Sequence, residues 1–284
     1  MNIRPLTESD LQAVMRLSTQ AGWNQLEIDW LRLMRLFPQQ CLGGWIDDQL
    51  IATGTLATYG HELGWVGMML VDEAHRRRGH GLAILDAIIA LAHRLEIPTL
   101  GLDATNFGQP LYAQRGFLPW RGINRWLRQS TAPSTNVTCP AATVTDWPDI
   151  LQLDRMAIGV DRSNLLRALF AEPGAMLHVV RESRPLLGFA SARPGRTAAY
   201  IGPLVAQSQE IAAQLIDSLL HHISHSTMPQ NVLIDTIDSN PLAPILQPRS
   251  FSIQRQLLRM YRPSPPPRLG HPSLPIAAAS FALG

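Results

Sequence analysis

One stretch of the chain, Trp65–Gly81, joins an apolar segment to a basic turn that contains two glycines. The apolar residues Trp65–Val71 have strand character, and the turn Arg76–Gly81 leads into the apolar, helix-forming run Leu82–His93. The free N–H groups and the positive dipole end of a helix N-terminus favour an anion. Glycine lets the backbone approach that anion, and arginine adds charge-assisted hydrogen bonds. The stretch therefore predicts a phosphate or pyrophosphate site.

The pattern of the turn narrows the choice of phosphate ligand. It lacks the Gly-x-x-x-x-Gly-Lys-Ser/Thr loop of nucleoside triphosphatases and the Gly-x-Gly-x-x-Gly fingerprint of dinucleotide-binding folds. It reads Arg76-x-x-Gly79-x-Gly81, and further along the chain the expected strand Thr99–Asp103 precedes Leu111–Phe117. Together these segments resemble the GNAT superfamily of acyl-CoA-dependent N-acetyltransferases. Taken alone, the turn is also compatible with an ordinary capped helix that has a solvated basic edge.

The second half of the chain repeats features of the first at an offset of about 134 residues. Gly67–Val71 corresponds to Ile201–Val205, and Arg115–Phe117 corresponds to Arg249–Phe251. Each copy reads as strand, helix, strand and a closing segment that carries an aromatic residue, which is typical of a mixed α/β unit. We therefore expect an α/β (α+β) fold of two tandem GNAT-like domains, each with a mixed, mainly antiparallel sheet flanked by helices.

The domain boundary should fall in the polar, proline-containing run Gln129–Asn136. We expect a GNAT acetyltransferase domain over residues 1–130 and a second GNAT-like domain over 136–262. The proline-rich remainder, 263–284, is predicted to be a flexible tail, and Ile276–Leu283 within it could instead form a short docking helix.

The second copy lacks the features of the phosphate turn. After Val205 it has Ala206–Glu210, which contains no glycine or arginine and places an acid where phosphates would lie. The chain as far as about residue 262 resembles a bacterial tandem-GNAT group, in which a CoA-binding N-terminal domain is fused to a second, degenerate domain. We expect the second domain not to hold CoA in the usual way.

The resemblance implies roles for residues of the first copy. Met69, Leu70 and Val71 would hydrogen-bond the pantetheine arm of acetyl-CoA through their main chains, much as an added strand would. Tyr112 would lie beside the sulfur and protonate the leaving thiolate, since a phenol has an unperturbed pKa of about 10; the alternative is a packing role at a helix start. The residues expected around the phosphates are Arg76, Arg77, Arg78, Gly79, His80 and Gly81.

The general base and the acceptor site are less well defined by the sequence. Asp103, at the end of a strand, is our candidate for a substrate or proton contact, and His61 or Glu62 are alternatives. Trp23, Asn24 and Gln25 fall in the loop that covers the acceptor in GNAT enzymes. Together with Trp30 they could bind an amine through cation–π contacts and hydrogen bonds.

Polar residues of the second copy leave two interpretations open. They could complete the acceptor pocket or seal the interface of the two domains, or they could form internal salt bridges; they are Asp161, Arg162, Arg193, Arg196, Asp235 and Asp238. His221 and His225 lie one turn apart on an expected helix, but no carboxylate or cysteine accompanies them at ligand spacing, so we expect no metal.

Composition excludes several classes of protein. The net charge of +2 does not favour nucleic acid, and no window has the apolar length of a membrane span. The two cysteines form no paired motif, and the N-terminus has no apolar signal region, which predicts a cytoplasmic protein. We expect an acetyl-CoA-dependent N-acetyltransferase that acts on a primary amine of a small molecule, with a homodimer left open. The alternative is an acyl-CoA sensor or scaffold without turnover.

Overall fold

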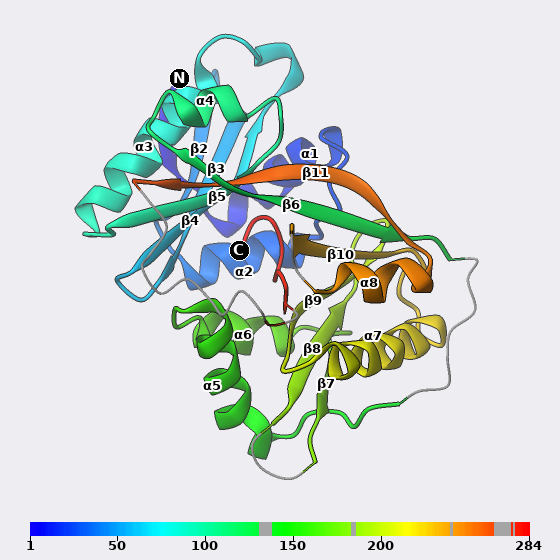
Figure 1. Cartoon of the computed structure of the whole chain (residues 1–284). Helices are drawn as coiled ribbons and strands as arrows, with labels where there is room; N and C mark the ends of the chain where they lie inside the picture. Colours follow the sequence, from blue (N-terminus) through cyan, green and yellow to red (C-terminus); the bar gives the residue numbers. More distant parts are fainter. Residues whose placement is uncertain (131–137, 183–185, 239–240, 264–273, 275) are drawn as a thin grey trace. The chain divides into compact units, whose positions relative to one another are not determined.

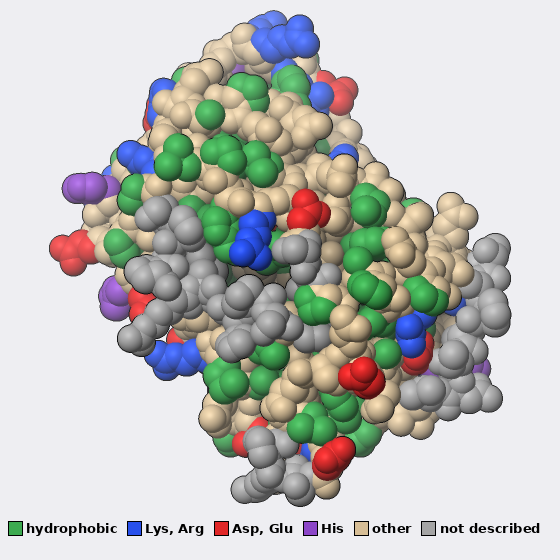
Figure 2. Space-filling view, in the orientation of Figure 1, with side chains coloured by type: hydrophobic (Ala, Val, Ile, Leu, Met, Phe, Trp, Pro, Cys, Tyr) green, Lys and Arg blue, Asp and Glu red, His purple; other side chains and the backbone are tan. Residues whose placement is uncertain are grey.

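The computed structural model describes residues 1–130, 138–182, 186–238, 241–263, 274 and 276–284 (Figure 1). The chain divides into two compact units. The first unit comprises Met1–Trp120, Leu258–Pro266 and Phe281–Gly284, and the second comprises Arg121–Leu257 and Pro267–Ser280. Figure 2 shows one face of the molecule, on which acidic and basic side chains are scattered among hydrophobic and uncharged atoms.

The first unit is built on a sheet in the order β1-β2-β3-β4-β5-β11, in which only the β4–β5 pair is parallel. Figure 1 shows α3 on one side of this sheet and α1 and α2 on the other. The strands are β1 (Asn2–Pro5), β2 (Cys41–Ile46), β3 (Gln49–Tyr59), β4 (Leu63–Val71), β5 (Thr99–Ala104) and the end of β11 (Phe251–Arg262). The helices are α1 (Leu11–Gln20), α2 (Glu27–Leu36), α3 (His80–Arg94) and α4 (Gln109–Ala113), with short 3-10 turns η1 (Glu8–Asp10) and η2 (Glu73–His75).

Helix α3 forms because its apolar residues recur at helical spacing and cover one face of the sheet. Ile84 and Ile88 are fully buried in a cluster that includes Leu56 and Val66 of the sheet. The fit over β3 is close: a Cβ at Gly54 would lie 2.6 Å from Cγ2 of Ile84. This packing fixes the N-terminus of α3 at the end of β4.

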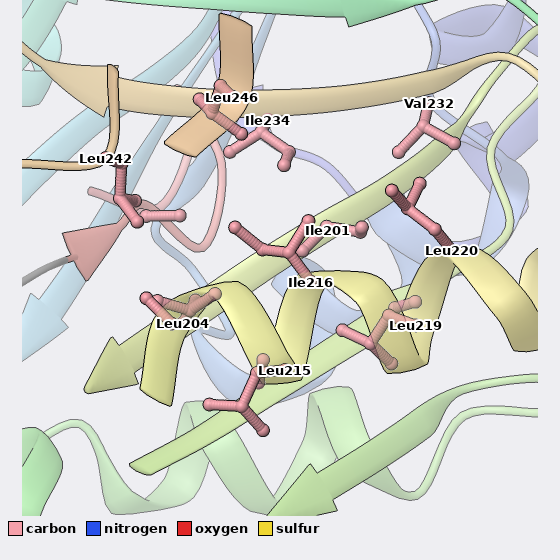
Figure 3. Packing of buried hydrophobic residues seen from close by; sticks show 14 of the residues in the cluster. Ile201, Leu204, Leu215, Ile216, Leu219, Leu220, Val232, Ile234, Leu242 and Leu246 are labelled. Carbon is pink, nitrogen blue, oxygen red and sulfur yellow. The ribbon is translucent and has the colours of Figure 1, made fainter. Parts of the chain in front are cut away.

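The second unit has a sheet in the order β6-β10-β9-β8-β7, with β12 paired to β9. Its strands are β6 (Leu118–Arg128), β7 (Met176–Val180), β8 (Gly188–Arg193), β9 (Ala199–Ala206), β10 (Val232–Ile237) and β12 (Ile276–Ala277). Its helices are α5 (Trp147–Ile158), α6 (Ser163–Phe170), α7 (Gln209–Ser224) and α8 (Ala243–Leu246), with 3-10 turns η3 (Val144–Asp146) and η4 (Gln247–Arg249). Leu215, Ile216 and Leu219 of α7 pack on Ile201 and Ile234 of the sheet (Figure 3).

The two units share a detail of strand register that supports the internal repeat. On β4, Gly67 lies opposite Thr55 and Leu70 opposite Thr53, so the register shifts between these pairs. On β9, Ile201 lies opposite Ala192 and Leu204 opposite Ala190, with the same shift. Gly67–Val71 and Ile201–Val205 therefore occupy equivalent positions, and the expected mixed α/β fold of two similar units is confirmed.

The units are not two consecutive segments of the chain, whereas the sequence suggested a first domain of 1–130 and a second of 136–262. Strand β6 pairs with β10 of the second unit over Ile123–Arg128, and the end of β11 pairs with β5 of the first unit over Leu258–Arg262. The last strand of each repeat thus completes the sheet of the other. Most of the expected boundary lies at 131–137, outside the described residues.

The tail prediction is corrected for residues 276–284. Ile276–Ala277 forms β12, and Ala277, Ala279 and Leu283 are buried, so this segment is an ordered part of both units and neither a flexible tail nor a docking helix. This strand could not be predicted, because the three consecutive alanines of the segment carry no strand periodicity. The rest of the predicted tail, 264–273 and 275, lies outside the described residues.

Candidate functional site

The parallel strands β4 and β5 separate part of the way along their length. They are paired only where Leu63–Trp65 lies beside Thr99–Gly101. Beyond Trp65, β4 continues to pair with β3 as far as Val71, and β5 continues to pair with β11. Among the described strands, none pairs with the edge of β4 that faces β5 after Trp65. This edge therefore offers main-chain groups to an extended ligand.

A β-bulge opens the gap between these strands. Met68 and Met69 together lie opposite Gly54, and Met68 has a φ of 49°, in the left-handed region. The hydroxyl of Thr53 donates a hydrogen bond to the carbonyl of Met68 at 2.8 Å, which holds the strained backbone. A bulge of this kind bends the strand locally, so β4 turns away from β5.

The predicted phosphate turn follows the unpaired edge directly. Residues 72–79 connect β4 to α3, and Gly79 is the N-terminal cap of the helix with a φ of 83°. The space beside Gly79 is open, because no heavy atom lies within 4 Å of where its Cβ would stand. Arg77 and Arg78 are exposed at the same turn. The first N–H groups of α3 thus face a site that an anion can approach.

Two residues of the turn differ from the simple phosphate-binding expectation. Arg76 donates from Nε to the carbonyl of Val71 at 3.2 Å and lies 3.3 Å from a carboxylate oxygen of Glu73, so it braces the loop. Burial and the nearby His75 lower the pKa of His80, so its ring is neutral at pH 7. The loop cations available to a phosphate are thus Arg77 and Arg78.

Asp72 is a structural anchor that the sequence analysis did not single out. Its carboxylate accepts a hydrogen bond from the backbone N–H of Ala74 at 3.0 Å and pairs with Arg16 at 2.6 Å. The bond from Arg16 lowers the pKa of Asp72. Its position directly after the strand and before a 3-10 turn is a capping signal that could have indicated this role.

Tyr112 lies in the core beside the separated strands. It is 9% exposed, and its ring packs edge-to-face on Phe117 with centroids 6.0 Å apart. Gly108 leaves room for it, since a Cβ there would lie 3.0 Å from the tyrosine ring. Burial raises the pKa of Tyr112, which keeps the phenol protonated and able to act only as a proton donor near neutral pH.

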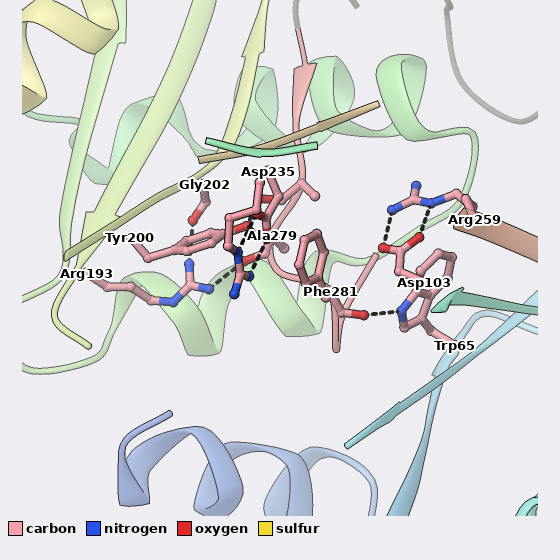
Figure 4. A network of polar contacts seen from close by, with 11 residues as sticks. Trp65, Asp103, Arg193, Tyr200, Gly202, Asp235, Arg259, Ala279 and Phe281 are labelled. Carbon is pink, nitrogen blue, oxygen red and sulfur yellow. Dashed lines mark hydrogen bonds and ion pairs between the residues drawn. The ribbon is translucent and has the colours of Figure 1, made fainter. Parts of the chain in front are cut away.

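Asp103 is not a free carboxylate. Its side chain is fully buried, and its two oxygens accept hydrogen bonds from Nε and Nη2 of Arg259 at 2.7 and 2.8 Å (Figure 4). The guanidinium group of Arg259 lies over the ring of Trp65, 4.5 Å from its centroid. A carboxylate held in this way is poorly placed to take a proton from a substrate, and its geometry favours a positioning role. The sequence did not indicate its partner, which comes from β11.

The remaining candidate residues for the base and the acceptor site lie in two separate loops of the first unit. His61 and Glu62 are exposed in the turn before β4, so the length of the strand separates them from the phosphate turn. Trp23, Asn24 and Gln25 are half-buried in the loop that joins α1 to α2.

Gln25 in that loop and Trp30 in the helix that follows differ in their hydrogen bonding. Among the described residues no hydrogen-bond partner is found for the buried Oε1 of Gln25. Trp30 is a correction: it is fully buried and its Nε1 donates to Ser18 at 2.9 Å, so it belongs to the core and not to an acceptor pocket.

Residues 281–284 lie against β4 close to its bulge, which the sequence did not predict. Nε1 of Trp65 donates to the carbonyl of Phe281 at 2.9 Å, and the hydroxyl of Tyr59 donates to the carbonyl of Leu283 at 2.5 Å. A Cβ at Gly67 would lie 2.6 Å from the carbonyl oxygen of Ala282. Gly67 is thus needed for this close approach, and the segment lines the same end of the gap as the Asp103–Arg259 pair.

The second unit has no comparable phosphate turn. Strand β9 reaches α7 through residues 207–208 alone, and the hydroxyl of Ser208 caps the helix by accepting from the N–H of Ile211 at 3.3 Å. Two of its notable charged residues form internal pairs: Arg162 bonds Asp154, and Asp235 bonds Arg125. Among the described residues, no cluster of His, Cys, Asp and Glu could hold a metal ion.

Comparison with known proteins agrees with this geometry. Residues 8–117 match the acetyltransferase (GNAT) family, and residues 150–273 match an acetyltransferase (GNAT) domain. The chain is a tandem GNAT protein. An uncharacterized N-acetyltransferase, YitH, of Bacillus subtilis is 28% identical over 75% of the chain and 76% of its own length. A holothin acyltransferase of Pseudoalteromonas is 23% identical over 99% of the chain and 94% of its own length.

Solved structures share the fold of this tandem GNAT protein. A putative acetyltransferase of Pyrococcus horikoshii superposes with a TM-score of 0.86 at 20% identity, covering 100% of the chain and 95% of its own. A tandem GNAT protein from the clavulanic acid biosynthesis pathway superposes with a TM-score of 0.64 at 14% identity, covering 92% and 97%. The family and the curated relatives place the chain among acyltransferases. None of its described helices is long and apolar enough to cross a membrane.

Proposed function

We propose that the first unit binds acetyl-CoA between β4 and β5 and transfers its acetyl group to a primary amine of a small molecule. The observation that carries the proposal is the unpaired edge of β4, which leads directly into an open, glycine-capped helix N-terminus with two exposed arginines. Members of the GNAT family use acetyl-CoA, so the substrate supplies an activated thioester.

Each part of the site has a role in this proposal. The main chains of Met69, Leu70 and Val71 pair with the extended arm of the substrate, as an added strand would. The backbone around Gly79 and Gly81, with Arg77 and Arg78, binds the phosphates.

As the amine nitrogen bonds to the thioester carbon and the carbon–sulfur bond breaks, Tyr112 supplies a proton to the departing thiolate, and the proton that the nitrogen loses passes through solvent and restores the phenol. Asp103 acts as a positioning residue that keeps Arg259 over Trp65 at the acceptor end of the gap. Trp23, Asn24 and Gln25 contact the acceptor. One relative is named a holothin acyltransferase, so holothin belongs in the first acceptor screen.

Isothermal titration of the full chain with acetyl-CoA tests the binding step. We expect one site per chain, with affinity lost in Arg78→Glu and in Gly79→Trp, whose side chain fills the open space. Gly60→Trp is the matched control, because Gly60 also has a positive φ and open space but lies in the turn before β4. No binding by the wild-type chain would refute the proposal.

An amine panel followed by thiol detection tests the transfer step. Release of CoA thiol that depends on an added amine would support the enzyme. Binding of acetyl-CoA without turnover on any amine would instead favour a sensor or scaffold.

A further inference from the structure

In the second unit, the chain's own C-terminal segment lies at the position of the unpaired edge of the first. Ile276 pairs with Val205 and Ala277 with Leu204 in antiparallel register. Leu204 and Val205 are equivalent to Leu70 and Val71 through the shared bulge. The next residue, Ala278, donates its N–H to the carbonyl of Asp235 on β10 at 2.9 Å. The segment therefore closes the gap between β9 and β10 beyond their last paired residues, Ile201 and Ile234.

Buried polar side chains hold the backbone of this segment (Figure 4). Arg193, 6% exposed, donates to the carbonyls of Gly202 and Ala279. The single proton of the Tyr200 hydroxyl is shared between the carbonyl of Ala278 at 3.2 Å and a carboxylate oxygen of Asp235 at 2.9 Å. Burying an arginine is costly unless its donors are satisfied, and one of its acceptors here is a carbonyl of the segment. These contacts recognise a peptide backbone.

The shape of the gap sets which side chains fit. A Cβ at Gly202, whose φ is 153°, would lie 2.2 Å from the carbonyl oxygen of Ala278, so only glycine allows this approach. Ala277 and Ala279 are fully buried and Ala278 is 7% exposed. The gap thus accepts three successive small residues.

We propose that the gap between β9 and β10 is a binding site for an extended peptide, with Ile276–Ser280 as its resident ligand in place of an acyl-CoA arm. The ligand class is a peptide with an aliphatic residue followed by three small ones. The absence of a glycine–arginine turn in residues 207–208 agrees with a neutral backbone and not a pyrophosphate as ligand.

Binding in trans tests the site. A fluorescent peptide of residues 274–280 is titrated against the full chain that carries Ala278→Pro in its own segment, with fluorescence anisotropy as the readout. We expect saturable binding at one site, lost by at least about tenfold in an Ala278→Pro peptide, which has no N–H for Asp235. A Ser280→Ala peptide is the matched control and binds as the parent does. Equal binding of the Pro peptide, no binding of the parent peptide to the folded Ala278→Pro chain, or displacement by acetyl-CoA would overturn the proposal.

Hydrogen exchange on the full chain tests the same site without an added peptide. We expect the Ala278 amide to be protected in the wild type and to lose at least tenfold of that protection in Tyr200→Phe, which removes one contact to the segment. Exchange of Ala278 at the rate of an unstructured peptide would refute the proposal. Neither measurement depends on acetyl transfer, so this proposal and the proposed function can fail separately.

Discussion

Breaking the buried Asp103–Arg259 pair should destabilise the first unit far more than removing the pair altogether. The two side chains are 0% and 7% exposed and share two hydrogen bonds of 2.7 and 2.8 Å. Asp103→Asn keeps the shape but leaves the Arg259 charge buried without its anion, which costs about 3–5 kcal/mol. At about 2–4 °C for each kcal/mol, the melting temperature should fall by about 6–20 °C.

The control for this prediction removes both charges. Asp103→Leu combined with Arg259→Met replaces the pair with apolar side chains, which is often neutral or stabilising. Differential scanning calorimetry of the three proteins measures the effect. The reasoning is refuted if Asp103→Asn melts within about 2 °C of the wild type, or if the double variant melts as low as the single one.

The same variant separates a positioning role from a base. If Asp103 positions Arg259 and Trp65, Asp103→Asn should raise the KM for the acceptor amine while the pH profile of kcat keeps its shape. If Asp103 were the general base, the acidic limb of that profile would disappear and kcat would fall by about 10²–10⁴-fold.

Three further predictions concern other parts of the chain. Tyr112→Phe should lower kcat by about 10²-fold or more and leave the Kd for acetyl-CoA within twofold, measured by steady-state kinetics and titration; an unchanged kcat would exclude the acid role. Gly67→Ala should cost about 1–3 kcal/mol of unfolding free energy because its Cβ meets Ala282, whereas Gly81→Ala, with contacts of 3.3 Å or more, should cost less than half as much. Burial lowers the pKa of His178 to about 4, so its proton binds more tightly to the unfolded chain and the second unit should lose stability as pH falls from about 6.5 to 4. Denaturant titrations should show this loss reduced in His178→Gln.

Local sequence signals predicted the parts of the site that depend on neighbours in the chain. The strand, the turn Arg76–Gly81 and helix α3 follow from hydrophobic periodicity and glycine placement within one stretch. The equivalence of Gly67–Val71 and Ile201–Val205, predicted by the repeat offset, reappears in the matching bulges. The absence of the phosphate turn in the second copy could also be predicted from the sequence, because a short connection with no glycine or arginine is a local property.

Contacts between residues that are distant in the chain could not be predicted from local sequence patterns. Arg259 reaches Asp103 because β11 completes the first sheet. No sequence pattern near Asp103 indicates a partner so far along the chain. Trp30 is of a residue type that is common in binding sites, but its hydrogen bond to Ser18 makes it part of the core. Residues 276–284 have a composition typical of a tail. They adopt a fixed structure because hydrogen-bonding groups in each unit bind their backbone.

The gap between the two parallel strands differs between the two copies. A strand edge left unpaired by a bulge must find partners for its main-chain groups, from water, a ligand or another strand. In the first unit the glycine turn and the exposed arginines favour an anionic ligand along β4. In the second, β12 pairs with β9, and Tyr200 and Arg193 bind the carbonyls of the next two residues, Ala278 and Ala279. In the two proposals, the gap of the first unit binds an extended cofactor arm, and the gap of the second unit, which lacks the phosphate turn and pairs with β12, binds an extended peptide.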